Sequence, residues 1–179
     1  MFSDVHIDGA MILKKFVQEL GSDVEVHHRI RDGYGQYILQ FSNEHIVQQL
    51  KNLRITYNKL ETRTSLPPIS RGLMRHFIRG LFDGDGSICT FKEAEKDRYY
   101  LQFLGNPKLL EQVSLEIENS INTDKRIFYS KPVRDIKNLG SITSRSKKNI
   151  SLVRDYLYND ANYYFNYKRE KFYKITESL

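Results

Sequence analysis

The sequence predicts an α+β fold built from repeated units of two antiparallel strands and a helix. Three observations predict it: apolar and polar residues alternate in short runs, apolar residues recur at helical spacing between those runs, and the two patterns follow one another in the same order along the chain. The 179 residues, 40% of them hydrophobic, suffice for one domain or for two small similar ones.

The residue pattern of the first half, residues 1–58, predicts a helix, a strand pair and a second helix. Apolar residues from Ala10 to Leu20 have helical spacing, and Gly21 can end that helix. The turn residues Asp-Gly-Tyr-Gly separate two alternating segments. The expected elements are a helix over residues 10–20, strands over 24–30 and 37–41, and a helix over 43–53.

The second half, residues 71–179, repeats this order after a linker over residues 59–70. Pro67 and Pro68 cannot continue a helix, so the linker is expected to be extended. After a first helix, the expected elements are strands over 87–91 and 99–104, a helix over 107–120, strands over 126–133 and 140–144, and a helix over 148–158.

The helix expected over residues 71–84 differs from the others. Ser70 is suited to cap its start, and apolar residues recur on one face over three turns. Gly80 and Gly84 lie on one side, where each glycine costs about 1 kcal/mol unless close backbone approach offsets it. A second helix packed there would explain both glycines. The helix ends in two aspartates, and a carboxylate in that place can hold a divalent metal ion against a phosphate.

Residues 78–86, which read Ile-Arg-Gly-Leu-Phe-Asp-Gly-Asp-Gly, resemble the signature motif of the LAGLIDADG homing endonucleases. The flanking residues 68–69 and 87–88 and the C-terminal residues 156–172 are similar to that family too. The resemblance implies that two such helices pack at the centre of a pseudo-symmetric α+β protein whose curved antiparallel sheets lie in the DNA major groove. It covers nearly all of the second half, whereas the first half lacks a motif helix and a first strand.

The resemblance also implies site residues. Asp85, at the penultimate motif position, would be the catalytic acid that binds Mg²⁺ or Mn²⁺ at the scissile phosphate, and the Gly84 carbonyl oxygen would be a further ligand. Asp83 is expected to cap the helix or to pair locally. Lys168, in the family's basic tail, is an electrostatic catalytic candidate. Asp4 would be a second metal ligand if residues 2–4 were the relic of a first motif.

Other interpretations of the two aspartates are simpler. An isolated Asp-Gly-Asp-Gly is typical of an ordinary turn. An EF-hand calcium loop needs glycine at its sixth position and glutamate at its twelfth, where this chain has Ile88 and Ala94, so that site is excluded. The flanks and the order of elements favour the LAGLIDADG interpretation.

The expected DNA-contacting residues lie on strands, on their turns and beside them. A strand pair fits the major groove, and alternation directs every second side chain toward the bases. The net charge of +6 suits a polyanionic partner, although many unrelated proteins share it, and the resemblance implies that the partner is double-stranded DNA. The candidate base readers and phosphate binders are Arg29, Arg31, Lys92, Lys96, Arg98, Gln102, Lys125, Arg126, Tyr129, Lys131, Arg134, Arg145, Lys147 and Lys148.

Composition narrows the location of the protein. The single cysteine, Cys89, excludes an internal disulfide and a cysteine-based zinc cluster, and it is expected in the core. A reducing compartment is the simplest expectation: the cytoplasm of a bacterium, a phage host or an organelle, or a nucleus. No apolar run approaches the roughly 20 residues that cross a bilayer, so no membrane partner is expected.

The expected function is site-specific, metal-dependent cleavage of double-stranded DNA. Two chains would pair their helices 71–84 as a homodimer and bring two copies of Asp85 together, or one chain would act alone and at most nick. A chain that had lost cleavage would be a DNA-binding regulator or an RNA-binding maturase. A basic α+β protein with a protein partner stays open as well, and strand cations dispersed over both faces would favour it.

Overall fold

The computed structural model describes residues 2–4, 7–21, 24–31, 34–40, 42–55, 59–123, 125–133 and 136–177, without the side chains of residues 2–4, 7, 8, 31 and 34. Arg134 and the side chains of Asp4 and Arg31 therefore lie outside the described part. None of the described helices has both the length and the apolar character that a membrane span requires.

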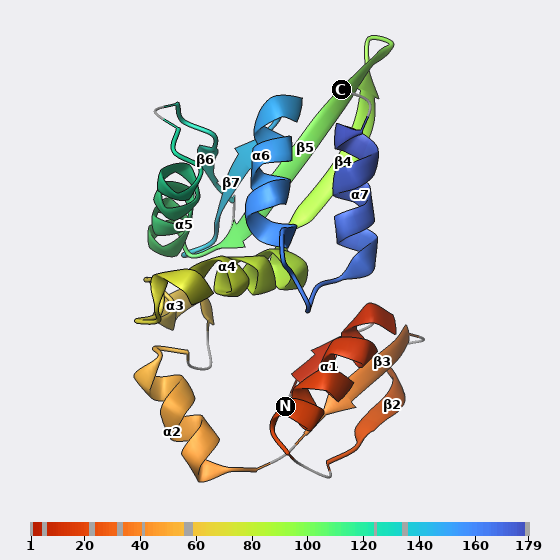
Figure 1. The fold of residues 1–179 in the computed structure, drawn as a ribbon, viewed down its shortest axis with the longest axis vertical. Helices are drawn as coiled ribbons and strands as arrows, with labels where there is room; N and C mark the ends of the chain where they lie inside the picture. The colour runs from red at the N-terminus through yellow and green to blue at the C-terminus, as the bar shows by residue number, and fades with distance from the viewer. Residues whose placement is uncertain are drawn as a thin grey trace.

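The N-terminal unit consists of a small antiparallel sheet with two helices (Figure 1). Its strand order is β1-β3-β2, and both pairings are antiparallel. The strand predicted over residues 37–41 begins earlier and ends at Leu39, while both predicted helices are present. Its elements are β1 (Phe2–Asp4), α1 (Ile7–Glu19), β2 (Val26–Arg31), β3 (Tyr34–Leu39) and α2 (Glu44–Asn52).

The C-terminal unit has a four-stranded antiparallel sheet of order β4-β5-β7-β6. Helices α5, α6 and α7 cover one of its faces, and α4 lies at the end that faces the N-terminal unit (Figure 1). The elements are α4 (Arg71–Asp85), β4 (Ser87–Glu93), β5 (Lys96–Gly105), α5 (Pro107–Ser120), β6 (Tyr129–Pro132), β7 (Gly140–Ser144), α6 (Lys147–Tyr158) and α7 (Asn166–Thr176).

The two units repeat one topology. In each, a helix follows one strand and precedes a strand pair, and the order β1-β3-β2 matches the order β5-β7-β6. Helix α1 then corresponds to α5, and α2 to α6. Among the described residues, the N-terminal unit has no counterpart of α4 and β4. The predicted α+β pseudo-repeat with an incomplete first half is therefore confirmed.

Three local predictions differ from the structure. The strand expected over residues 126–133 covers only Tyr129–Pro132, because Ile127 is buried and its backbone N–H donates to Glu118 Oε1 of α5 at 2.7 Å instead of joining the sheet. The linker holds a helical turn, α3 (Lys59–Thr62), before its prolines. Cys89 is exposed rather than in the core, because strand alternation places it opposite to the buried Ile88.

Strands β4 and β5 continue further than predicted, to a two-residue turn at Ala94 and Glu95. Both residues have positive φ, 48° and 62°, which is the conformation that a tight hairpin turn requires and that glycine or asparagine usually supplies. The run of charged residues between the two strands predicts a turn, but no glycine or asparagine marks its position at residues 94 and 95.

The hydrophobic core lies mainly in the C-terminal unit. Phe82 of α4 is fully buried, and its ring centroid lies 5.2 Å from that of Phe103 on β5 and 5.3 Å from that of Phe172 on α7. One residue of the motif helix thus joins the sheet to the last helix. Two contacts join this unit to the N-terminal unit at Tyr163: its hydroxyl donates to Glu19 Oε1 at 2.6 Å, and Lys15 Nζ lies 5.1 Å from its ring centroid.

Candidate functional site

The end of α4 passes directly into strand β4. Gly86 has an extended conformation, φ −81° and ψ 164°, and its N–H donates to the Phe82 carbonyl oxygen at 2.8 Å. A Cβ at residue 86 would lie 2.3 Å from Phe82 Cδ2 and 2.6 Å from the Phe82 carbonyl oxygen. The requirement for glycine here comes from this close approach, which fixes Asp85 at the join of helix and strand.

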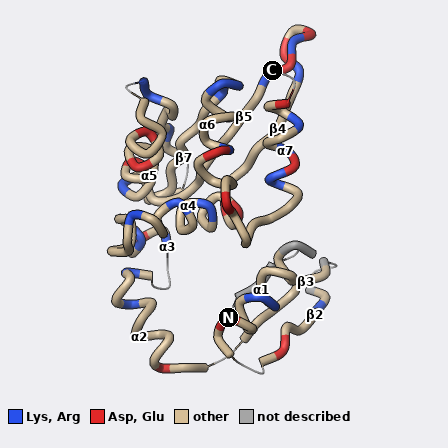
Figure 2. The backbone as a smooth tube through the Cα atoms, viewed as in Figure 1, with Lys and Arg blue, Asp and Glu red and all other residues tan. Residues whose placement is uncertain are grey.

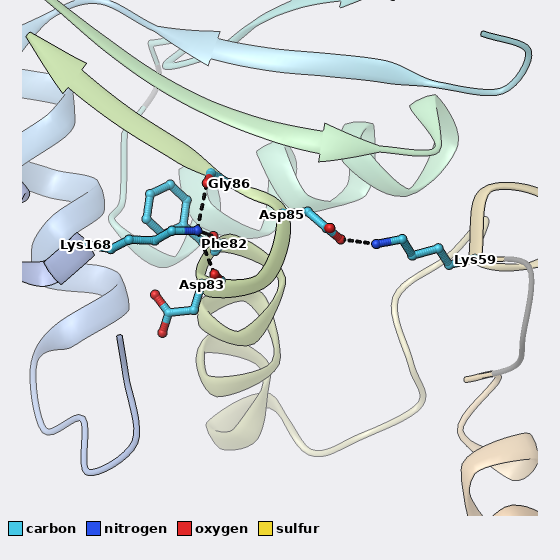
Figure 3. A network of polar contacts seen from close by, with 6 residues as sticks. All are labelled: Lys59, Phe82, Asp83, Asp85, Gly86 and Lys168. Carbon is cyan, nitrogen blue, oxygen red and sulfur yellow. Dashed lines mark hydrogen bonds and ion pairs between the residues drawn. The ribbon is translucent and has the colours of Figure 1, made fainter. Parts of the chain in front are cut away.

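Lys168 holds this helix end together. Its side chain reaches from α7 and is only 5% exposed. Its ammonium group donates to the carbonyl oxygens of Phe82 at 2.8 Å, Asp83 at 2.6 Å and Gly86 at 2.8 Å (Figure 3). A cation at the last carbonyls of a helix complements the helix dipole and adds a donor where few backbone partners remain; the Phe82 carbonyl oxygen accepts from Lys168 as well as from the Gly86 N–H. The structure thus places Lys168 next to the motif, in contact with its backbone.

Asp83 faces the helices behind the motif. It is 5% exposed; Tyr158 Oη donates to its Oδ1 at 2.7 Å, and the Phe165 N–H donates to its Oδ2 at 3.2 Å. Burial raises the pKa of Asp83 to about 6, although these two hydrogen bonds and the charges of Lys168 and Arg79 act in the opposite direction. The expected local partner is wrong: the two donors lie 75 and 82 residues further along the chain.

Arg79 makes a second connection from α4 to the same region. Its Nε donates to the Tyr163 carbonyl oxygen at 2.7 Å, and its side chain also donates to the Leu157 carbonyl oxygen at 3.1 Å. The guanidinium therefore satisfies backbone acceptors near the end of α6 and in the segment after it. Together with Asp83, it fixes the motif helix against α6 and α7.

Asp85 points to the opposite side of α4 from Asp83, toward the linker (Figure 3). Its Oδ2 lies 2.5 Å from Lys59 Nζ of α3, and 43% of its side chain is exposed. An exposed carboxylate at a fixed backbone position can take part in metal binding, whereas the enclosed carboxylate of Asp83 is occupied by Tyr158 and Phe165.

The donor set fits a Mg²⁺ or Mn²⁺ ion. Mg²⁺ is commonly held by one or two carboxylates, with waters and substrate phosphates completing its coordination. Asp85 supplies one carboxylate, and the Gly84 carbonyl oxygen belongs to the adjacent residue. No cluster of three or more His, Cys, Asp or Glu side chains that could hold an ion occurs in the described part of the chain. The residues thus suit an ion shared with a substrate better than a closed metal site.

Gly80 and Gly84 leave one side of α4 open. A Cβ built on either glycine would meet no atom within 4 Å, and both residues are exposed. Within the described ranges, no second helix therefore packs on that side. The packing role of the two glycines remains a prediction that depends on a partner.

Many of the strand candidates share one face of the large sheet. The strand register pairs Lys96 with Glu93, Arg98 with Phe91, and Gln102 with Ser87 and Thr143. All of these residues lie on the face of the sheet opposite to the buried Ile88 and Leu101. Lys92 differs, because its register partner is Asp97, on the same face as Leu101. The candidates on the open face are Lys96, Arg98, Gln102, Tyr129 and Lys131.

The remaining candidates surround this face or lie elsewhere. Arg145 and Lys147 follow β7 and lie over the rings of Tyr100 and Tyr99, at 5.9 Å and 5.6 Å from the ring centroids. Arg98 is paired with Glu93 at 2.9 Å, and the β4–β5 hairpin carries charges of both signs (Figure 2). The candidates that are exposed outside the open face are Arg29, Lys92, Lys125, Arg126, Arg145 and Lys148.

Sequence reasoning missed the linker cation Lys59 and the phenol of Tyr158. Lys59 lies in a segment without periodicity, and Tyr158 lies 75 residues from its carboxylate partner. Only the folded chain brings either residue to the motif.

The arrangement defines an α+β endonuclease fold of the LAGLIDADG type. The meganuclease I-SmaMI, whose structure is described as bound to uncleavable DNA, aligns with 93% of this chain and 74% of its own at a TM-score of 0.57 and 10% identity. Its likeness shows the fold, and the predicted resemblance to the LAGLIDADG homing endonucleases is confirmed at the level of the fold.

Two further structural neighbours align over shorter regions. The LAGLIDADG homing endonuclease I-GzeII, in complex with a DNA target, has a TM-score of 0.42 and 23% identity over 59% of this chain and 35% of its own. The homing endonuclease I-CvuI, in complex with its target, has a TM-score of 0.43 and 14% identity over 60% and 66%. The alignments thus span less than two thirds of these two neighbours. No protein-family model and no curated protein sequence matches the chain.

Proposed function

We propose that this protein is a site-specific endonuclease of the homing type that hydrolyses a phosphodiester of double-stranded DNA at Asp85. The supporting observation is an exposed carboxylate at the fixed end of the motif helix, in a fold that is shared with I-SmaMI over 93% of this chain. The neighbouring structures are described as DNA complexes, and the open face of the large sheet offers Lys96, Arg98 and Lys131 to such a partner.

The site residues have distinct roles in this proposal. Asp85 and the Gly84 carbonyl oxygen would hold Mg²⁺ or Mn²⁺, which supplies Lewis acidity at the phosphate and lowers the pKa of a bound water. Lys168 keeps the carbonyl oxygens around Asp85 in place and so fixes the position of the carboxylate. Asp83 binds Tyr158 and Phe165 and holds the helix that presents Asp85.

A second copy of Asp85 would come from a second chain. Gly80 and Gly84 leave room for close backbone approach, and two α4 helices paired there would place both Asp85 residues near one duplex. A homodimer of this kind would cut both strands, whereas a single chain would nick. The solution mass of the protein, measured with and without the DNA duplex, distinguishes the homodimer from the single chain.

The first test selects the sites that the protein binds from random double-stranded DNA and then measures cleavage of the selected duplexes with Mg²⁺. Asp85→Asn is expected to lower the cleavage rate by about a hundredfold or more, because the loss of a metal-binding charge removes transition-state stabilisation. DNA affinity should stay close to that of the unmodified protein. Asp160→Asn, at a side chain that is 85% exposed, is the matched control and should cleave normally. Equal cleavage by both variants would remove Asp85 from the mechanism.

A second candidate function is DNA binding without cleavage, as in a regulator, or RNA binding as a maturase. The observation that favours it is the single motif helix in the described part of the chain, with its Asp85 already paired to Lys59. Tight duplex binding with no Mg²⁺-dependent cut or nick on any selected site would support a regulator. Preferential binding of a structured RNA over the selected duplex would support a maturase.

A further inference from the structure

The linker between the two units is bound to the surface of the C-terminal unit. The Asn106 side chain, on a residue that is 6% exposed, donates to the Leu60 carbonyl oxygen at 2.7 Å. Gln112 donates to the Thr64 carbonyl oxygen and accepts from the Leu66 N–H, both at 3.2 Å. The N-cap residue of α5 and one residue within that helix thus hold the backbone of residues 60–66 against the C-terminal unit.

This attachment brings two cations to Asp85. Lys59 Nζ lies 2.5 Å from Asp85 Oδ2, and both side chains are partly exposed, 53% and 43%. Arg63, one turn further along, is close enough for the Asp85 charge to raise its pKa, although burial lowers that pKa more. Its Nε is buried and has no hydrogen-bond partner in the described part of the chain. Lys59, Arg63 and Asp85 line one hollow of about 210 Å³, with Leu81 and Leu104 among its apolar walls.

We propose that Lys59 and Arg63 form a phosphate-binding pair of the Asp85 site and bind the non-bridging oxygens of the DNA phosphate at that carboxylate. The proposal rests on the endonuclease function proposed above. Two positive groups against one carboxylate give the hollow a net charge of +1, which attracts a phosphodiester even without a metal ion. A guanidinium and a flexible ammonium are both suited to phosphate oxygens.

The ion pair between Lys59 and Asp85 uses the carboxylate oxygen that a metal ion at this site would need. An ammonium group and a divalent ion compete for the same carboxylate oxygen. A divalent ion bound by Asp85 would displace the Lys59 ammonium, and the partly exposed four-carbon stem of Lys59 would let the ammonium reach the phosphate. Removal of Lys59 should therefore tighten metal binding and weaken DNA binding.

The first experiment measures duplex affinity against salt concentration for Lys59→Ala, Arg63→Ala and the control Lys51→Ala, an exposed lysine on α2. Each site variant is expected to lose about tenfold in affinity and about one unit in the slope of log K against log salt, because one phosphate contact is gone. Lys59→Arg should restore most of the duplex affinity and most of the salt slope. Site-variant slopes equal to that of Lys51→Ala would overturn the proposal. Circular dichroism confirms that each variant is folded.

The second experiment titrates Mn²⁺ into the protein without DNA and measures cleavage separately. Lys59→Ala is expected to bind Mn²⁺ more tightly and yet to cleave the selected duplex more slowly. Faster cleavage, with an unchanged salt slope, would show that Lys59 only blocks the carboxylate, and would overturn the proposal. If the unmodified protein cuts no selected duplex, the endonuclease function fails, while the salt slopes still decide whether Lys59 and Arg63 bind phosphate.

Discussion

The N-terminal and C-terminal units share a strand order but differ in how their sheets are covered. In the C-terminal unit, α4 inserts Phe82 between the sheet and α7, and the core continues through α5 and α6. In the N-terminal unit, the described buried cluster consists of Leu13 and Val17 of α1 and Leu39 of β3. We therefore expect the N-terminal unit to be the less stable of the two, because the apolar area that a unit removes from water sets its driving force.

Phe82→Ala should have the largest effect on the free energy of unfolding of the C-terminal unit. A fully buried phenylalanine between two other rings leaves a cavity, and we expect a loss of about 3–5 kcal/mol in the free energy of unfolding. Denaturant titration measures it. The paired variant Leu39→Ala should leave the main transition in place and speed amide exchange in β1–β3, because the small cluster opens locally. A common shift of the main transition by both variants would show that the units unfold together.

The buried Asp83 carboxyl, which has no counterpart in the described N-terminal unit, should make the free energy of unfolding depend on pH. The Asp83 carboxyl has a pKa of about 6 when folded against 3.8 when unfolded, so the unfolded state loses its proton first and this group lowers stability as pH rises from about 4 to about 6. Over this pH range, the ionisation of Asp83 lowers the free energy of unfolding by about 3 kcal/mol.

Asp83→Asn removes this titration. Its amide can still accept from the Phe165 N–H and donate to the Tyr158 hydroxyl oxygen. Its stability relative to the unmodified protein should therefore increase across that pH range and stay constant above it, as denaturant titrations at several pH values measure. A constant difference from pH 4 to pH 7 would contradict the raised pKa.

Gly80→Ala and Gly84→Ala should have the smallest effect and a favourable one. Each Cβ enters open space, so each variant should gain up to about 1 kcal/mol from helix propensity if α4 is unpartnered. Thermal melting at several protein concentrations, together with sedimentation, measures both stability and association. A loss of stability together with loss of a dimer would instead show that the glycines contact a second helix. Gly86→Ala is the contrasting control, since its Cβ meets Phe82 at 2.3 Å.

Most of the fold could be predicted from the sequence because its signals are local. Helical spacing predicted α4 and α5 within a residue of their observed bounds, and alternation predicted the strand at Gly140–Ser144. Ile127 was misplaced in a strand, because its hydrogen bond to Glu118 depends on a neighbouring helix. A turn was expected between residues 91 and 99, but its narrow bounds at Ala94 and Glu95 were missed, because it uses positive φ without glycine or asparagine.

By itself, the sequence determined the motif helix, the position of Asp85 at its end and the repeated order of elements, since each depends on residues that are near one another in the chain. Only the tertiary structure decided what surrounds Asp85 and Asp83. Lys168 and Tyr158 reach the motif across more than seventy residues, and Lys59 reaches it from a linker without any periodic pattern. Such contacts depend on packing and on chain crossings, which leave no mark in local sequence patterns.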